Sequence, residues 1–253
     1  MKLLITGGAG YIGSHVVLAA IEKGYQVTIF DDLSTGNEKN INKECEFVKG
    51  STKSISALSG LFKDRNFDAV IHLAGKKAAG ESMNDPIRYA EDNIIGSLNL
   101  INFCIENKAT NLIFSSSASV YGVPKFLPIN EQHSLSPMNY YGFTKLSIEN
   151  HLKWFSNLIG FRYVALRYFN AAGYDIKKRV LGLEKNPQNL IPILMEVAKS
   201  TRTSINIYGN DYDTDDGTGV RDYIHVTDLA AAHIDALNHL VRKKNSLIVN
   251  LGS

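Results

Sequence analysis

The 253-residue sequence has little of several features that mark whole classes of protein. It contains two cysteines, Cys45 and Cys104, without motif spacing, so neither a disulfide framework nor a cysteine-based zinc site is expected. No apolar run approaches the roughly 18 residues that a membrane span requires. The first residues pass directly into a strand-like run and lack the layout of a signal peptide. We therefore expect a cytoplasmic protein with no membrane partner.

An excess of charge of one sign is also absent. The chain carries 27 Lys and Arg against 25 Asp and Glu, a net charge of +2, and the basic residues are scattered. Binding to nucleic acid through a polybasic surface is therefore not expected. The apolar fraction of 44% is too high for a disordered chain. The length suits one large α/β domain, or a core with a smaller lobe.

Strand-like and helix-like segments alternate through the first two-thirds of the chain. This alternation is typical of a doubly wound parallel sheet whose strands are joined by helical crossovers, the Rossmann arrangement. Strands are predicted at residues 2–6, 26–31, 46–49, 69–73, 111–115 and 163–167, and helices at 12–23, 54–62, 85–107 and 141–158.

The alternation breaks after Arg167. We predict an NAD-binding domain at residues 1–168 and a mainly substrate-binding lobe at 169–253, whose last helix and strand return to the sheet. A terminal strand with no closing element suggests a fold that is incomplete at its C-terminus. The predicted elements are a loop at 169–186, a helix at 188–199, a strand at 204–208, an acidic loop at 212–219, a helix at 227–241 with Thr227 as N-cap, and a strand at 246–251.

A glycine-rich turn follows the first predicted strand. Gly7, Gly10 and Gly13 are spaced three apart and lead into a helix, the context in which such a turn binds a pyrophosphate. Asp31 ends the second predicted strand, 18 residues after Gly13. A carboxylate there accepts hydrogen bonds from an adenosine ribose and repels a 2′-phosphate, so NAD is favoured over NADP.

Tyr141 and Lys145 are four residues apart, on one face of a predicted amphipathic helix. A nearby ammonium group lowers the pKa of a phenol, which suits tyrosine for proton transfer. Tyr-x-x-x-Lys also occurs at Tyr121 and at Tyr174, outside any predicted helix, and these two are interpreted as chance. Ser117 follows the strand at 111–115, where a hydroxyl can meet a substrate at the carboxyl edge of the sheet.

Together these residues resemble the extended short-chain dehydrogenase/reductase superfamily and, within it, the UDP-glucose 4-epimerase family. The resemblance extends over the whole chain and is carried by residues 6–15, 70–75, 115–122, 141–145, 167–173, 208–212 and 216–226. It implies NAD-dependent inversion at C4 of a UDP-hexose through a 4-keto sugar. Tyr141 would take the proton of the 4-hydroxyl, Lys145 would lower the pKa of that tyrosine, and Ser117 would support the transfer. A homodimer through a four-helix interface, formed by residues 85–107 and 141–158, is also implied.

The resemblance assigns further residues to each ligand. The cofactor residues are Gly7, Gly10, Tyr11, Ile12, Gly13, Asp31, Leu73, Ala74, Gly75, Lys77, Asn93, Ser115, Tyr141, Lys145 and Tyr168. The UDP-sugar residues are Ser117, Tyr141, Asn170, Asn189, Leu190, Tyr208 and Arg221. Structural roles stay open for two of these, because Arg221 could pair with a nearby acid and Asn170 could satisfy a strand end. No metal site is expected.

The chain departs from the family at a few positions. Ser51 stands where an aspartate usually reads adenine, and Lys76 replaces an apolar residue near the cofactor, so weaker NAD binding is expected. The family also extends beyond the last residue of this chain, and that part carries further substrate contacts.

Three alternative functions follow from the same residues. A 4,6-dehydratase needs an Asp-Glu pair directly after the strand-end serine, where Ala118 and Ser119 stand. A reductase needs exchangeable NAD(P)H, and Asp31 disfavours NADPH. A non-catalytic NAD- or UDP-sugar-binding module is supported by the early end of the chain but opposed by the intact Ser117, Tyr141 and Lys145. Whether acetylated UDP-hexoses are accepted stays open.

Overall fold

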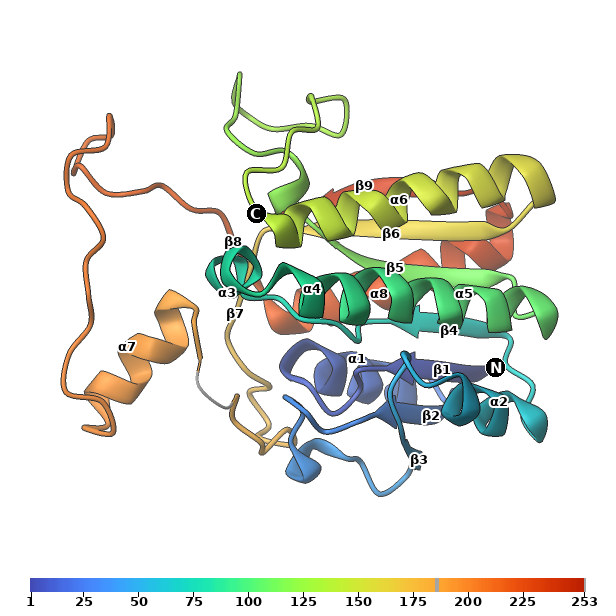
Figure 1. Ribbon diagram of the computed structural model, residues 1–253. Helices are drawn as coiled ribbons and strands as arrows, with labels where there is room; N and C mark the ends of the chain where they lie inside the picture. Colours follow the sequence, from blue (N-terminus) through green and yellow to red (C-terminus); the bar gives the residue numbers. More distant parts are fainter. Residues whose placement is uncertain (185–186, 253) are drawn as a thin grey trace.

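A computed structural model describes residues 1–184 and 187–252 (Figure 1). Its main sheet has seven strands, all parallel, in the order β3-β2-β1-β4-β5-β6-β9. The predicted doubly wound parallel sheet is therefore confirmed. The strands are β1 (Lys2–Thr6), β2 (Gln26–Asp31), β3 (Glu46–Lys49), β4 (Ala69–His72), β5 (Asn111–Ser117), β6 (Arg162–Tyr168) and β9 (Leu247–Leu251).

Helices cover both faces of this sheet, which is why the central strands are apolar along their whole length. Leu3 and Ile5 of β1 face α1 (Tyr11–Glu22) and α8 (Val226–Lys243), in one buried cluster. Leu4 points to the opposite face, where it belongs to the cluster under α2 (Ile55–Lys63), α5 (Gly96–Glu106) and α6 (Tyr140–Ile159). The alternation places consecutive side chains in different cores.

The helix expected at 85–107 is interrupted. Its parts are α4 (Pro86–Tyr89), a π-helical turn η2 (Ala90–Ile95) and α5, and a further helix α3 (Ala79–Asn84) precedes them. Asp85 ends α3 and caps α4, since its carboxylate accepts a hydrogen bond from Arg88 N and Pro86 begins the next turn. The π-helical turn carries Asn93, a predicted cofactor residue.

The segment after β6 is less regular. A second sheet pairs β7 (Asn170–Ala172) with β8 (Tyr223–His225). Between them α7 (Leu190–Ala198) and the connection to β8 stand away from the main sheet (Figure 1), and α7 has no buried residue. The strand predicted at 204–208 is wrong, because this extended segment pairs with no other strand of the described chain.

The start of α8 also differs from the prediction. The cap is His225, whose side chain accepts the backbone N–H of Thr227, so the helix begins at Val226 and the prediction of Thr227 as N-cap is wrong. Part of the predicted loop at 169–186, namely 185–186, and the last residue lie outside the described residues. In the part of the chain described here, no helix has both the length and the apolar character that crossing a membrane requires.

Candidate active site

The glycine-rich turn joins β1 to α1 at the carboxyl edge of the sheet, where ligands of such sheets bind. Gly7 has a φ of 74°, and a Cβ atom on it would lie 2.6 Å from the backbone nitrogen of Ala74. A Cβ on Gly13 would lie 2.0 Å from the carbonyl oxygen of Gly7. Both positions therefore require glycine, and the absence of side chains leaves a bare backbone cradle at the start of α1.

The residues around this cradle fit a dinucleotide. Gly10 caps α1 without a side chain, so the first N–H groups and the positive end of this 12-residue helix point into the turn. Asp31 lies beneath the turn and accepts hydrogen bonds from Ala9 N at 3.0 Å and Leu33 N at 2.8 Å. Burial raises the pKa of Asp31 against the effect of these two bonds. Each carboxylate oxygen keeps a lone pair for a ribose hydroxyl.

The loop after β4 borders the cradle. Leu73 N donates to the carbonyl of Thr6 at 3.0 Å, which aligns the loop with the end of β1. Asn93 is buried and holds both backbone groups of Lys76, accepting from its nitrogen at 2.7 Å and donating to its oxygen at 3.0 Å. The amide of Asn93 thus shapes the loop that carries Gly75 and Lys77.

Lys77 and Tyr11 lie on the side of the cradle that faces the second sheet. The ammonium of Lys77 lies 2.5 Å from a carboxylate oxygen of Glu184 and 6.0 Å from the centre of the Tyr11 ring. The Tyr11 hydroxyl donates to the carbonyl of Gly173 at 2.6 Å, and burial raises the pKa of this phenol. These contacts bring the segment after β7 against the glycine-rich turn.

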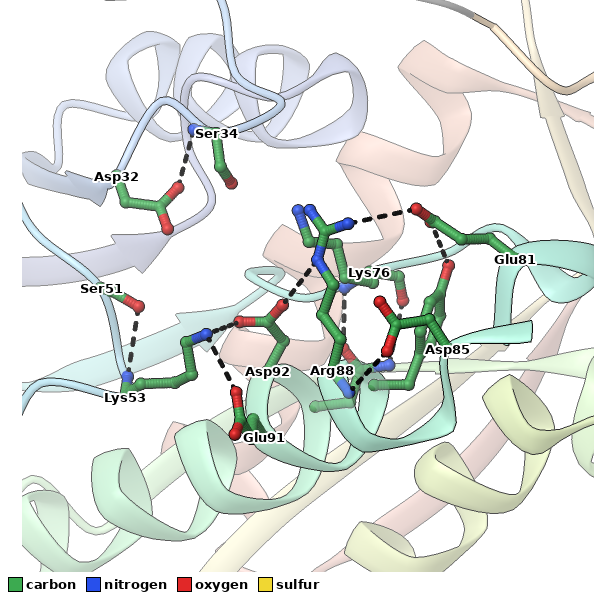
Figure 2. Close-up of polar contacts among 12 residues, drawn as sticks. Asp32, Ser34, Ser51, Lys53, Lys76, Glu81, Asp85, Arg88, Glu91 and Asp92 are labelled. Atoms are coloured by element: carbon green, nitrogen blue, oxygen red, sulfur yellow. Dashed lines mark hydrogen bonds and ion pairs between the residues drawn. The ribbon is translucent and has the colours of Figure 1, made fainter. Parts of the chain in front are cut away.

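Charged side chains surround the two departures from the family (Figure 2). The Ser51 hydroxyl accepts the backbone N–H of Lys53 at 3.3 Å, and the Lys53 ammonium lies 2.9 Å from Asp92. Hydrogen bonding to Asp92 raises the pKa of Lys53. Arg88 pairs with Asp92 at 3.9 Å, so this carboxylate joins α4, η2 and the loop after β3 beside Lys76.

Tyr141 and Lys145 lie at the start of α6, in its first two turns, with Ser117 opposite them at the end of β5. Asn139 caps the helix by accepting Gly142 N at 2.8 Å. The Lys145 ammonium donates to the carbonyl oxygen of Ser115 at 2.8 Å and lies 5.8 Å from the centre of the Tyr141 ring. The structure therefore brings together the three residues that the sequence predicted as catalytic.

The electrostatics of this set are governed by burial. Burial lowers the pKa of Lys145 to about 8, against the opposite effect of Glu149. Burial also raises the pKa of Tyr141, while the Ser117 hydroxyl, within hydrogen-bonding reach, lowers it. In this structure the net shift of Tyr141 is upward, which differs from the expected lowering by Lys145. NAD⁺ held by the cradle would add positive charge to the site, which would favour the phenolate.

Tyr168 is the last residue of β6, the strand that pairs with β5 and therefore lies next to Ser115. His233 of α8 donates from Nδ1 to the carbonyl of Leu229 at 2.8 Å, so its Nε2 accepts the Tyr168 hydroxyl at 3.2 Å. Burial lowers the pKa of His233 to about 4, which keeps this acceptor neutral. Sequence reasoning missed His233, and a polar side chain on the buried face of an amphipathic helix is the signal that could have found it.

The predicted substrate residues are spread over the second sheet and the segment that connects its two strands. Asn170 donates its side-chain N–H to the carbonyl of Asp222 at 2.8 Å and thereby links β7 to β8. Arg221 is exposed and donates to the carbonyl of Val220 at 2.7 Å. Leu190 and Tyr208 are 49% and 83% exposed, and Asn189 precedes α7, so these three lie on the segment that stands away from the sheet.

Sequence reasoning also missed a buried ion pair below the catalytic set. Glu149 on α6 and Arg167 on β6 are each 2% exposed and lie 2.5 Å apart. Glu149 follows Lys145 by four residues, on the apolar face of the predicted helix. An acidic residue at a core position of that pattern was the available signal.

The fold and this arrangement define a Rossmann-type enzyme that binds a dinucleotide beside a Ser-Tyr-Lys set. The NAD dependent epimerase/dehydratase family matches residues 3–252. This chain belongs to that family.

Known relatives refine the comparison. The chain is 43% identical to the UDP-glucose 4-epimerase of Halalkalibacterium halodurans over 254 aligned residues, which cover 100% of the chain and 75% of the relative. It is similar to the crystal structure of UDP-glucose 4-epimerase from Brucella ovis in complex with NAD, with a TM-score of 0.95, 42% identity, and coverage of 99% and 77%. The enzyme from Bifidobacterium longum in complex with NAD⁺ and UDP gives a TM-score of 0.94 at 37% identity, with coverage of 100% and 78%.

Proposed function

We propose that this chain is an isomerase that interconverts UDP-glucose and UDP-galactose by inverting C4 of the sugar, with NAD as cofactor. One observation carries the proposal. Ser117, Tyr141 and Lys145 meet beside a backbone cradle that fits a dinucleotide, in a chain whose relatives with the same fold are UDP-glucose 4-epimerases.

In the proposed reaction, Tyr141 takes the proton from the 4-hydroxyl and returns it after the 4-keto sugar has presented its other face. NAD, when bound in the cradle, would accept the hydride of C4 and give it back to the other face of the 4-keto sugar, so that the cofactor is regenerated. Ser117 holds the reacting oxygen against Tyr141 and lowers the pKa of the phenol. Lys145, fixed by the Ser115 carbonyl, places a positive charge beside the phenol.

We further propose that Asn170, Asn189, Leu190, Tyr208 and Arg221 bind the UDP group. Arg221 suits a diphosphate because its guanidinium donates paired, charge-assisted hydrogen bonds. This role predicts that Arg221→Ala raises KM for UDP-glucose with a smaller change in kcat.

A homodimer through α6 and the segment from α4 to α5 is the proposed assembly. Large apolar side chains are exposed on both, including Trp154 at 63%, Leu158 at 70% and Ile87 at 73%. Helices with uncovered apolar residues bury them on association. Sedimentation velocity of the chain and of the Trp154→Glu/Leu158→Glu variant checks this, with a dimer expected only for the former.

The test of function is incubation of the purified chain with UDP-glucose, without added cofactor and then with NAD, followed by chromatography of the UDP-sugars. UDP-galactose is the expected product, and Tyr141→Phe is the matched control because it removes one hydroxyl from the same ring. A 4-keto-6-deoxy product would overturn the proposal in favour of a dehydratase. Absence of conversion in both conditions, with NAD bound, would overturn it in favour of a binding module.

A further inference from the structure

Beneath the catalytic set lies a buried ion pair with both carboxylate oxygens engaged. Arg167 donates from Nε to Glu149 Oε1 at 2.9 Å and from Nη2 to Oε2 at 2.5 Å. The Ser116 hydroxyl also donates to Oε1 of Glu149. The carboxylate therefore joins one helix, α6, to two neighbouring strands, β5 and β6.

The contacts extend past the ion pair. The third nitrogen of the guanidinium, Nη1 of Arg167, donates to the Tyr121 hydroxyl at 2.9 Å, and that hydroxyl donates to Asn250 Oδ1 at 2.5 Å. The same guanidinium lies 4.9 Å from the centre of the Tyr121 ring. Asn250 belongs to β9, so the connected polar groups cross three adjacent strands.

A buried ion pair is not the most stabilising way to fill a protein core. Removing two charges from water costs free energy that their attraction only partly returns, and apolar pairs of equal volume are often as stable. The surrounding positions on the same faces, among them Ile148, Leu152 and Ala165, are apolar. A charged pair at this one place therefore calls for a role other than filling space.

The position of the pair in the fold indicates that role. Ser116 lies between Ser115, whose carbonyl accepts the Lys145 ammonium, and Ser117, which reaches Tyr141. Arg167 directly precedes Tyr168, and Glu149 follows Lys145 by one helical turn. Each residue of the ion pair is thus connected, through one helical turn or one strand position, to a residue of the proposed active site.

We propose that Glu149 and Arg167 are positioning residues, which hold α6 in register with β5 and β6 and keep Lys145 in its charged form beside Tyr141. The kinetic consequence rests on the proposed function. The effect on Lys145 itself does not, because it concerns a proton on this chain's own side chain.

The charged and titratable groups that surround Lys145 support the proposal that Glu149 keeps it charged. From its own helix Lys145 is faced by Tyr141 and Glu149, and from β4 by His72. On β6, Tyr168 is a neighbour of Tyr141 and Ser115, and Arg167 lies behind Glu149. Burial lowers the pKa of His72 to about 3 and raises that of Tyr168, so both are neutral near pH 7. Glu149 is therefore the group that opposes the effect of burial on the Lys145 ammonium.

The experiment compares three variants with the wild-type chain loaded with NAD. Glu149→Gln keeps the shape of the side chain and removes its charge. Glu149→Leu/Arg167→Met removes both charges and decides the question if the single variant does not fold. Glu46→Gln is the matched control. Glu46 lies on β3, away from α6, its side chain is 50% exposed, and it forms an ion pair with Arg65.

The first readout is NMR titration of the lysine ammonium groups, with Lys145→Met identifying the resonance. In Glu149→Gln the titration midpoint of Lys145 is expected to fall by about one pH unit. The second readout is the pH profile of kcat, whose alkaline limb should move to lower pH by the same amount with KM for UDP-glucose changed less than kcat. The double variant should show a smaller displacement in the same direction, because it also removes the positive charge of Arg167, and Glu46→Gln should show none.

An unchanged Lys145 midpoint and an unchanged alkaline limb in Glu149→Gln, or in the double variant if only that one folds, would overturn the proposal. If the wild-type chain itself converts no UDP-sugar, the proposed function fails, and the NMR midpoint still decides the positioning role by itself.

Discussion

The Lys145 ammonium lies 2.8 Å from the carbonyl oxygen of Ser115, so the side chain expected to act on Tyr141 also fastens α6 to β5. One donor of the ammonium is thereby used inside the protein, and among the described residues its other two donors have no hydrogen-bond acceptor, so they can serve a ligand. The packing of α6 on the sheet therefore fixes the position of Lys145 beside Tyr141.

Replacing Tyr141 by phenylalanine should lower kcat by about 10²- to 10⁴-fold, the range for loss of a general acid–base group. The thermal midpoint and the NAD content should stay close to those of the wild type, since the ring and its packing remain. Steady-state kinetics and calorimetry check this. A variant that retains full activity would remove Tyr141 from the proposed chemistry.

Gly13→Ala should destabilise the fold by about 1–3 kcal/mol, because its Cβ would lie 2.0 Å from the Gly7 carbonyl and force the turn apart. NAD binding should weaken with it. Urea unfolding and titration with NAD measure the two effects. Gly60→Ala in α2, where a Cβ meets no atom within 4 Å, is the control and should be neutral or slightly stabilising.

The lowered pKa of Lys145 predicts a rise in stability at alkaline pH. The folded chain releases this proton near pH 8, whereas the unfolded chain keeps it until about 10.5, so the unfolded state binds more protons in between. The free energy of unfolding should therefore gain about 3 kcal/mol from Lys145 between these values. Urea unfolding of the chain and of Lys145→Met at pH 7.5 and 10 checks this, and a wild-type rise no larger than that of the variant would contradict it.

Replacing one partner of the buried ion pair should lower the free energy of unfolding more than replacing both partners. Arg167→Met leaves the Glu149 carboxylate without its bidentate partner, and a loss of about 3–5 kcal/mol is expected. Glu149→Leu/Arg167→Met should lose less than the single variant, since no buried charge remains. Chemical denaturation of both variants gives the comparison, and a larger loss in the double variant would contradict this expectation.

Much of the fold was predictable from local patterns. Strands such as β1 and β2 matched their predicted bounds, because buried parallel strands are apolar throughout and end in glycine or acidic turns. The predictions failed where the determinant was not local. The helix at 85–107 contains a π-helical turn around Asn93, and the segment at 204–208 pairs with no strand in residues 1–184 and 187–252.

Residue types and short-range spacing were sufficient to predict the class of the fold and the glycine-rich turn, and they favoured Tyr141 over the two other Tyr-x-x-x-Lys pairs. Which of these groups contact one another became clear only from the three-dimensional packing. Ser115 on β5 and Arg167 and Tyr168 on β6 lie on adjacent strands, and Lys145 and Glu149 lie on α6, the helix that packs against these strands. Hydrogen bonds and buried charges depend on such contacts in space, and the order of residues along a chain does not specify them.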